Sequence, residues 1–260
     1  SFALSDSEQP VTFYLDNGKK VDKLPDDFYS TRYYTDKMIE YLRKCPQDKP
    51  FFGYLAFTAP HDPLQIIPEW KDREKGTYDC GYDSIRSARL ERQKQMGLIP
   101  AQTPDTDLSN PSIQWNKLSK EQQKEQSRKM EIYASMIEYV DYSIGRVLEE
   151  LEKEHKLDNT LVLFMSDNGA NPKEPESYPG NTKEVIQERY DNQLKNYGNS
   201  NSFISLGEAW AEVCNTPYSL YKMTTHEGGI CVPLIISGKN INQKGSIDHT
   251  TLLHVTDLFP

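Results

Sequence analysis

The sequence predicts an α/β fold in which a mostly parallel sheet is flanked by helices. Three short apolar runs, at 51–57, 160–166 and 232–237, have the length and continuity of strands that are buried on both faces. Stretches with apolar residues at helical spacing lie before and between these runs. Alternation of helix and strand is typical of parallel sheets, whose strands are connected by helices.

The first helix is predicted to begin near Pro25, because Asp26 and Asp27 then place two acids in its first turn. Cys45-Pro46 is predicted to end it. Its apolar face consists of Phe28, Thr35, Met38, Ile39 and Leu42. The run 51–57, with the sequence FFGYLAF, follows as the first predicted strand.

The longest helix is predicted after Ser119, which forms a capping-box pattern with Gln122. A single apolar stripe of this length is more typical of a helix packed on a sheet than of a coiled coil. The stripe consists of Met130, Tyr133, Ala134, Ile137, Val140, Ile144, Val147, Leu148 and Leu151. Residues 1–260 are interpreted as part of one large catalytic domain, in which segments 66–116 and 171–215 are insertions or active-site loops.

The composition limits the possible partners. The 260 residues carry Lys+Arg 30 against Asp+Glu 39, a formal net charge of -9, which argues against nucleic acid or an anionic membrane as a partner. A small anionic substrate remains compatible, because local charge governs a site. No apolar stretch reaches the ~18 residues of a membrane span. The four cysteines form no C-x-x-C pair, and there is no N-x-[ST] acceptor in which x is a residue other than proline. Both features favour a reducing, cytoplasmic compartment.

Two strand ends carry candidate site residues. In APHDP, His61 lies between Pro60 and Pro63, which keep the backbone extended and suit a side chain aimed at a fixed target. A structural histidine is the alternative. After 160–166, Asp167 and Asn168 offer hard oxygen ligands of the kind that Ca²⁺ and Mg²⁺ prefer. The alternative there is a hairpin turn, because Asn-Gly accepts a positive φ.

A third motif, YKMTTHEGGICVP, precedes the last predicted strand. It is not a zincin motif, because Ile230 occupies the position of the second histidine. Gly228 and Gly229 predict a tight turn into the strand. Lys222, a few positions earlier, is available to an anion, although an exposed surface lysine is the simpler interpretation.

In this order, APH-x-P, S-D-N-G-A and Y-K-x-T-T-x-E-G-G-I-x-V-P resemble the motifs of the sulfatase family of the alkaline phosphatase superfamily. Longer stretches, including LPDDFYSTRYYTDKMIEYL and MEIYASMIEYVDYSIGRVLEELE, look like its bacterial arylsulfatase and alkylsulfatase branch. The resemblance covers most of the chain from about Leu24 onward. It implies an alkaline phosphatase-like fold and the hydrolysis of aryl or alkyl sulfate esters to an alcohol or phenol and inorganic sulfate.

The family pattern implies a role for each candidate residue. Asp167 and Asn168 match ligands of a divalent cation, Ca²⁺ rather than Mg²⁺. Lys222 matches the lysine that binds sulfate oxygens. His61 matches the histidine that donates to the ester and is the candidate acid for the leaving oxygen. Charge neutralisation on the non-bridging oxygens and protonation of the leaving group are what this hydrolysis needs.

The nucleophile motif is missing from the sequence. Sulfatases use a formylglycine made from the Cys or Ser of C/S-x-P-x-R by a formylglycine-generating enzyme, and this motif is absent. Cys231-Val232-Pro233 and Ser177-Tyr178-Pro179 both fail, because Ile235 and Asn181 stand where arginine is required. The resemblance puts the nucleophile and the remaining metal ligands N-terminal to this region. We therefore expect a piece cut at both ends that is inactive by itself.

Two other functions remain open at this stage. A phosphonate monoester or phosphodiester hydrolase of the same superfamily would share the fold and similar ligands. A catalytically dead, sulfatase-like binding protein would lack C/S-x-P-x-R in its complete reading frame. The choice between aryl and alkyl esters and the oligomeric state do not follow from these motifs.

Overall fold

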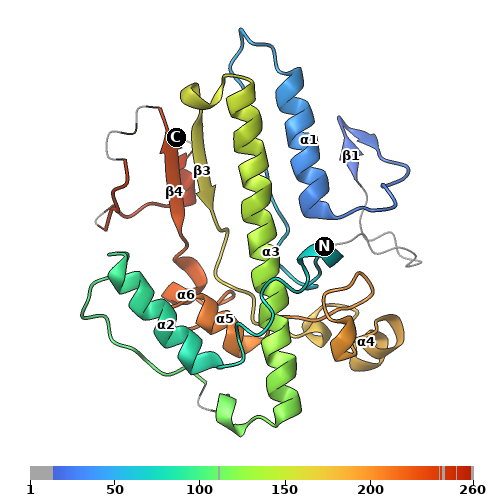
Figure 1. The fold of residues 1–260 in the computed structure, drawn as a ribbon, viewed down its shortest axis with the longest axis vertical. Coiled ribbons are helices and arrows are strands. Elements are labelled where there is room, and N and C mark those ends of the chain that lie inside the picture. The colour runs from blue at the N-terminus through green and yellow to red at the C-terminus, as the bar shows by residue number, and fades with distance from the viewer. Residues whose placement is uncertain (1–13, 111, 240, 242–243, 250, 259–260) are drawn as a thin grey trace.

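The computed structural model describes residues 14–110, 112–239, 241, 244–249 and 251–258. This part of the chain contains both helices and short strands, with three helices between β2 and β3 and three more between β3 and β4 (Figure 1). The helices are α1 (Ser30–Lys44), α2 (Tyr82–Gln95), α3 (Lys120–Lys153), α4 (Lys183–Arg189), α5 (Glu208–Cys214) and α6 (Glu227–Ile230). The strands are β1 (Leu15–Asp16), β2 (Lys19–Lys20), β3 (Leu161–Met165) and β4 (Leu234–Gly238).

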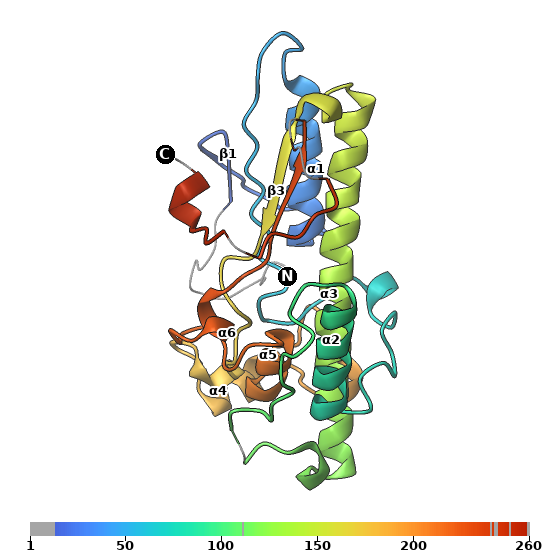
Figure 2. The same cartoon turned by 90° about the vertical axis from the view of Figure 1, so that its left-hand side faces the viewer.

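Helix α3 runs through the whole length of the molecule and organises both of its halves (Figures 1 and 2). Its predicted capping box is confirmed: the Ser119 hydroxyl accepts from the Gln122 amide at 3.2 Å, and Gln122 Oε1 accepts from the Ser119 amide at 2.8 Å. Its C-terminal half packs against α1, and α2 and α5 lie beside its N-terminal half. The apolar stripe is confirmed in part: Met130, Tyr133, Val140 and Leu151 are buried, whereas Ile137 is 46% exposed.

The main hydrophobic core surrounds the N-terminal half of α3. Trp210 of α5 is fully buried at its centre, where its ring contacts those of Tyr78 and Tyr82 edge to face, with centroids 5.8 and 4.8 Å apart. The Trp210 indole N–H donates to the Gln126 carbonyl at 2.8 Å, so its polar atom is satisfied inside the core. This core holds the loops that carry the candidate site residues.

Helix α1 confirms the predicted stop but not the predicted start. Cys45 ends it, as expected from the following proline. The helix begins at Ser30 rather than near Pro25, because the Phe28 amide donates to the Pro25 carbonyl at 3.0 Å and closes a turn first. Arg43 then joins α1 to α3 through two hydrogen bonds to Glu150, at 2.6 and 2.8 Å.

The predicted strands at 160–166 and 232–237 are confirmed as β3 and β4, but their direction corrects the sequence prediction. They pair antiparallel, with Leu161 opposite Gly238 and Met165 opposite Leu234. In the described residues, a parallel sheet is therefore not found, and parallel pairing is limited to one bridge between Gln65 and Gly198. The connection from β3 to β4 contains the three helices α4, α5 and α6 and several loops, and such a long path can return in either direction.

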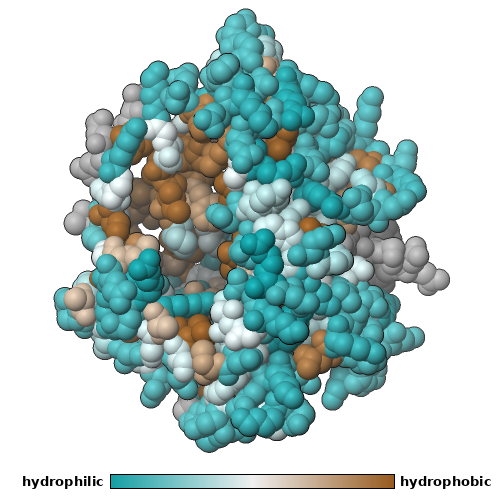
Figure 3. All heavy atoms as spheres, viewed as in Figure 1, coloured by the Kyte–Doolittle hydropathy of each residue, from teal (hydrophilic) through white to brown (hydrophobic). Residues whose placement is uncertain are grey.

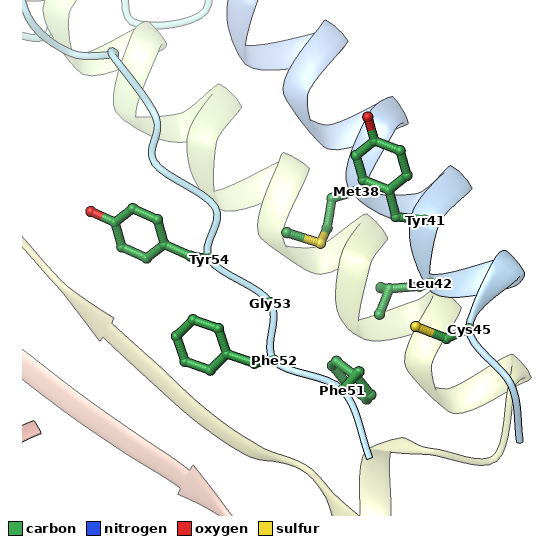
Figure 4. A pocket seen from close by; sticks show the side chains of 8 residues that line it. All are labelled: Met38, Tyr41, Leu42, Cys45, Phe51, Phe52, Gly53 and Tyr54. Carbon is green, nitrogen blue, oxygen red and sulfur yellow. The ribbon is translucent and has the colours of Figure 1, made fainter. Parts of the chain in front are cut away.

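The strand predicted at 51–57 is wrong for the described structure, because this segment is extended but unpaired. Phe52 and Tyr54 are 88% and 80% exposed, and in Figure 4 they point away from α1. Met38 and Leu42 of α1 line a shallow pocket with the same segment. The apolar run predicted burial, but a strand also requires a neighbouring edge to which its backbone can bond.

The sheet formed by β3 and β4 leaves apolar side chains exposed. Figure 3 shows hydrophobic side chains gathered in a hollow over this part of the molecule. The exposed set consists of Leu161, Leu163, Phe164, Ile235 and Ile236. Full burial of these strands, which the continuous apolar runs predicted, is therefore not found among the described residues.

The two segments interpreted as insertions are both structured. Segment 66–116 contains α2, and segment 171–215 contains α4 and α5. Both contribute to the core, through Tyr82 and Trp210 among others. Their status as insertions in a domain spanning 1–260 stays a prediction. None of the helices in the described residues is long and apolar enough to cross a membrane.

Candidate functional site

The candidate metal-binding residues follow β3 directly. Asp167 is exposed, and Asn168 is partly buried with its side-chain amide nitrogen donating to the Gly169 carbonyl at 2.9 Å. That bond uses the nitrogen of the amide and leaves the oxygen, which is the metal-binding atom. The hairpin interpretation of Asn168-Gly169 is wrong, because the chain does not turn back here: β4 follows only after α4, α5 and α6.

Gly169 packs backbone to backbone against the third motif. Its amide donates to the Gly229 carbonyl at 3.1 Å. A β-carbon at Gly169 would lie 1.8 Å from the Gly228 carbonyl oxygen, so only glycine fits this approach. Gly228 and Gly229 belong to the single-turn helix α6 rather than to a simple turn, and both are buried. The end of β3 and the third motif therefore form one packed unit.

Lys222 is held beside the same strand end by its backbone. Its amide donates to the Ala170 carbonyl at 3.1 Å, and its side chain is partly buried. Leu220 and Met223, on either side, have φ of 64° and 73°, a left-handed conformation that residues other than glycine seldom adopt. Asn215 fixes this arrangement, because it accepts from the Ala170 amide at 3.0 Å and donates to the Leu220 carbonyl at 2.9 Å.

His61 lies on the loop that joins the extended segment 51–57 to the core. Its backbone amide donates to the Thr58 carbonyl at 3.0 Å, and its ring Nδ1 lies 2.9 Å from the Asp62 carbonyl oxygen. A carbonyl oxygen only accepts, so Nδ1 carries a proton in this contact. The side chain is 42% exposed and its ring centroid lies 6.3 Å from that of Tyr178. The ring is therefore both oriented and accessible.

Asp62 connects the first motif to the second. Its side chain is 2% exposed, and its Oδ1 accepts from the Asn171 side-chain amide at 3.0 Å. Its Oδ2 accepts from the Tyr178 hydroxyl and from the Ser205 hydroxyl, the latter at 2.8 Å. Sequence reasoning missed Asp62 and Asn215. The position of Asp62 between His61 and a proline was the available signal for it.

These contacts join the loops of all three motifs at the end of β3. The loop of Asp167 and Asn168 contacts the His61 loop through Asn171, and the Lys222 loop through Ala170. In the described residues, no hydrogen bond or ion pair joins the four predicted side chains directly to one another. The arrangement is therefore a set of neighbouring loops, and the four predicted side chains are not bonded to one another.

The two predicted metal-binding residues have the type of ligand atom that a divalent cation prefers, but they are too few to hold one by themselves. Asp167 and Asn168 provide a carboxylate and an amide oxygen, whereas Ca²⁺ takes six to eight oxygens. Over the described part of the chain, no group of three or more His, Cys, Asp or Glu side chains could hold a metal ion. Any cation bound here would therefore need further ligands.

The contact at Gly169 gives a first prediction. Gly169→Ala should lower the free energy of unfolding by about 1–3 kcal/mol, because its methyl group would overlap the Gly228 carbonyl. The measurement is thermal or urea unfolding of the purified protein. Gly145→Ala in α3 is the matched control: its β-carbon would have no neighbour within 4 Å. That control should raise stability by about 0.5–1 kcal/mol. Equal stabilities for the two variants would refute the tight approach.

Comparison with known proteins gives consistent matches. A family model described as Sulfatase matches residues 4–260. An arylsulfatase from Klebsiella aerogenes is 40% identical over 250 residues, covering 96% of this chain and 53% of that protein. An uncharacterized sulfatase from Schizosaccharomyces pombe is 40% identical over 225 residues, covering 86% of this chain and 41% of that protein. The chain spans about half the length of these curated relatives.

The similarity to solved structures is weaker. The structure of Ps i-CgsB aligns with a TM-score of 0.43 and 24% sequence identity. The alignment covers 86% of this chain and 30% of that chain.

Proposed function

Because the chain belongs to the sulfatase family, we propose that the protein hydrolyses organic sulfate esters, aryl or alkyl, to an alcohol or phenol and inorganic sulfate. The observation that carries the proposal is the meeting of three loops at the end of β3, which brings the neighbourhoods of His61, Lys222 and Asp167 together. The identity of 40% to an arylsulfatase over nearly the whole chain supports it. Family membership also supports an alkaline phosphatase-like fold for the complete domain.

Each residue has a separate task in the proposed reaction. Lys222 neutralises charge on the non-bridging sulfate oxygens. Asp167 and Asn168 contribute oxygen ligands to a divalent cation, for which we propose Ca²⁺ rather than Mg²⁺. When bound, the cation would supply further charge stabilisation. His61 donates the proton of its Nε2 to the departing oxygen. Because Nδ1 keeps its proton toward the Asp62 carbonyl, the acid in this step is the imidazolium, which becomes a neutral imidazole. This donation matters most when the alcohol is a poor leaving group.

The nucleophile lies outside this sequence in the proposal. Water attacks a sulfate ester slowly, and an in-line nucleophile supplies acceleration that binding groups alone lack. We propose a formylglycine, made by a formylglycine-generating enzyme, in a part of the domain that this chain does not contain. His61, Lys222 and the two metal-binding residues then hold and polarise the ester for it.

The proposal is tested by comparing two ester classes. The protein at the full length of its relatives, co-expressed with a formylglycine-generating enzyme and supplied with Ca²⁺, should release nitrophenol from nitrophenyl sulfate faster than from a nitrophenyl phosphonate. Preference for the phosphonate would support a phosphonate monoester or phosphodiester hydrolase instead. Binding of sulfate esters without turnover of either substrate would support a catalytically dead relative.

The role of His61 predicts a dependence on the leaving group. His61→Ala should lower kcat for an alkyl sulfate by about 10²–10⁴-fold, the usual contribution of a general acid. For nitrophenyl sulfate the loss should be much smaller, because nitrophenolate departs without protonation. Initial rates with both substrates measure this difference. Equal losses would count against His61 as the acid.

A further inference from the structure

The Asp62 carboxylate is clamped by three residues that are all more than 100 positions away from it in the sequence. Asn171 follows β3, Tyr178 lies before α4, and Ser205 lies before α5, and each donates a hydrogen bond to it. In the described residues, the one side chain within 4 Å that can carry a positive charge is the His61 imidazole, whose Nδ1 lies 3.9 Å from Oδ1. The clamp therefore consists of neutral donors, with an imidazole at its edge.

Burial makes the hydrogen bonds to the Asp62 carboxylate necessary. The Asp62 side chain is only 2% exposed, and burying a carboxylate costs free energy unless hydrogen bonds replace those it made with water. Hydrogen bonds to a charged acceptor are stronger than those between neutral groups. Burial and the hydrogen bond to Asp62 raise the pKa of the Tyr178 hydroxyl, so this group stays protonated and continues to donate. The backbone of Asp62 is consequently fixed by its own side chain.

The orientation of His61 depends on that backbone. Its Nδ1 donates to the Asp62 carbonyl, which leaves Nε2 on the opposite side of the ring. The amide of Leu64 donates to the Ile204 carbonyl at 2.9 Å, so the loop is also held just beyond Asp62. Movement of Asp62 would therefore change the direction in which the ring of His61 points.

The same carboxylate ties His61 to the predicted metal-binding loop. Asn171, which donates to Oδ1, follows Asn168 by three residues on the loop that leaves β3. Resting on the proposed function, we propose that Asp62 is a positioning residue that fixes His61 relative to Asp167 and Asn168. Proton donation and charge neutralisation then act on one ester. Asp62 itself touches no reacting atom.

The test is Asp62→Asn in the calcium-loaded, full-length protein. The amide keeps the size of the side chain but donates where the carboxylate accepted, so the clamp is disrupted. The kcat for an alkyl sulfate should fall by roughly 10–100-fold, the effect typical of residues that orient a functional group. The loss for nitrophenyl sulfate should be much smaller, and KM should change little. In a His61→Ala background, Asp62→Asn should add almost no further loss, because both changes act through one group.

Glu212→Gln is the matched control. Glu212 is also 2% exposed, and its carboxylate accepts hydrogen bonds from the amide and hydroxyl of Ser109. The Glu212→Gln substitution removes a buried, hydrogen-bonded charge at a position outside the His61 loop. Any loss of kcat in Glu212→Gln should be equal for the alkyl sulfate and for nitrophenyl sulfate. If Asp62→Asn behaves like Glu212→Gln, with unchanged dependence on the leaving group, the positioning role is refuted.

A readout independent of activity separates this inference from the proposed function. Nitrogen NMR of His61 should show protonated Nδ1 and contacts with the Tyr178 ring in the wild type and in Glu212→Gln. Asp62→Asn should lose both features. Retention of both in Asp62→Asn would overturn the positioning role, whatever the rates. Their loss in a protein whose wild type hydrolyses no sulfate ester would refute the proposed function and leave the positioning role intact.

Discussion

Lys222→Ala is expected to lower kcat/KM for nitrophenyl sulfate by about 10²–10³-fold, or roughly 3–4 kcal/mol, the scale of a lost oxyanion donor. Charge on the non-bridging oxygens must be neutralised as the ester bond breaks, and a fixed ammonium does this without reorganising water. The loop of Lys222 is suited to the task, because the Lys222 amide donates a hydrogen bond to the Ala170 carbonyl, beside the predicted metal-binding residues. The residues flanking Lys222 also hold an uncommon backbone conformation.

The control for Lys222→Ala removes the same charge elsewhere. Lys239 follows β4 at the end of the strand pair away from the site, where its ammonium contacts Asn159. Lys239→Ala should leave kcat/KM nearly unchanged, since a distant exposed charge is screened by salt. Lys222→Ala with wild-type kinetics would show that the lysine is a surface residue. Equal losses in both variants would indicate a general effect of net charge.

Asp167→Ala should remove bound Ca²⁺ and most of the activity. Asp167 supplies the one carboxylate of the predicted ligand pair, and charge count controls the affinity of calcium sites. Loss of a direct ligand should weaken affinity by more than the 10–100-fold that removal of a supporting residue typically causes. Elemental analysis of the folded protein, followed by calcium titration, measures the change.

Asp158 provides the control for Asp167. It is exposed and lies before β3, at the end of the strand opposite to the site. Asp158→Ala should retain calcium and activity, because its carboxylate is far from the predicted ligands. Unchanged metal content in a folded Asp167→Ala variant would exclude Asp167 as a ligand.

Features set by neighbouring residues were predictable from the sequence. The capping box at Ser119 and Gln122, the end of α1 at Cys45 and the positions of β3 and β4 all follow from patterns within a few residues. The direction in which β3 and β4 pair was not predictable in this way. It depends on the path of the chain between them rather than on the composition of either strand.

In the candidate site, too, features set by neighbouring residues were predictable and features set by distant contacts were not. His61, Lys222, Asp167 and Asn168 were identified from motifs that are contiguous in the sequence. Asp62 was missed because its role depends on hydrogen bonds from residues more than 100 positions away. Asn215, likewise, acquires its role only when the loops carrying Ala170 and Leu220 are brought together. Roles created by distant contacts become visible only in the folded chain.

We propose that this chain supplies the part of a sulfatase site that binds and polarises the ester, whereas the nucleophile comes from elsewhere in the domain. The most direct measurement is nitrophenol release from nitrophenyl sulfate, with and without calcium. The 260-residue chain is compared with the full-length protein that has been co-expressed with a formylglycine-generating enzyme. We expect calcium-dependent turnover by the full-length protein and none by the chain alone. Calcium-dependent turnover by the chain alone would contradict this division of the site, because the nucleophile would then lie within this sequence.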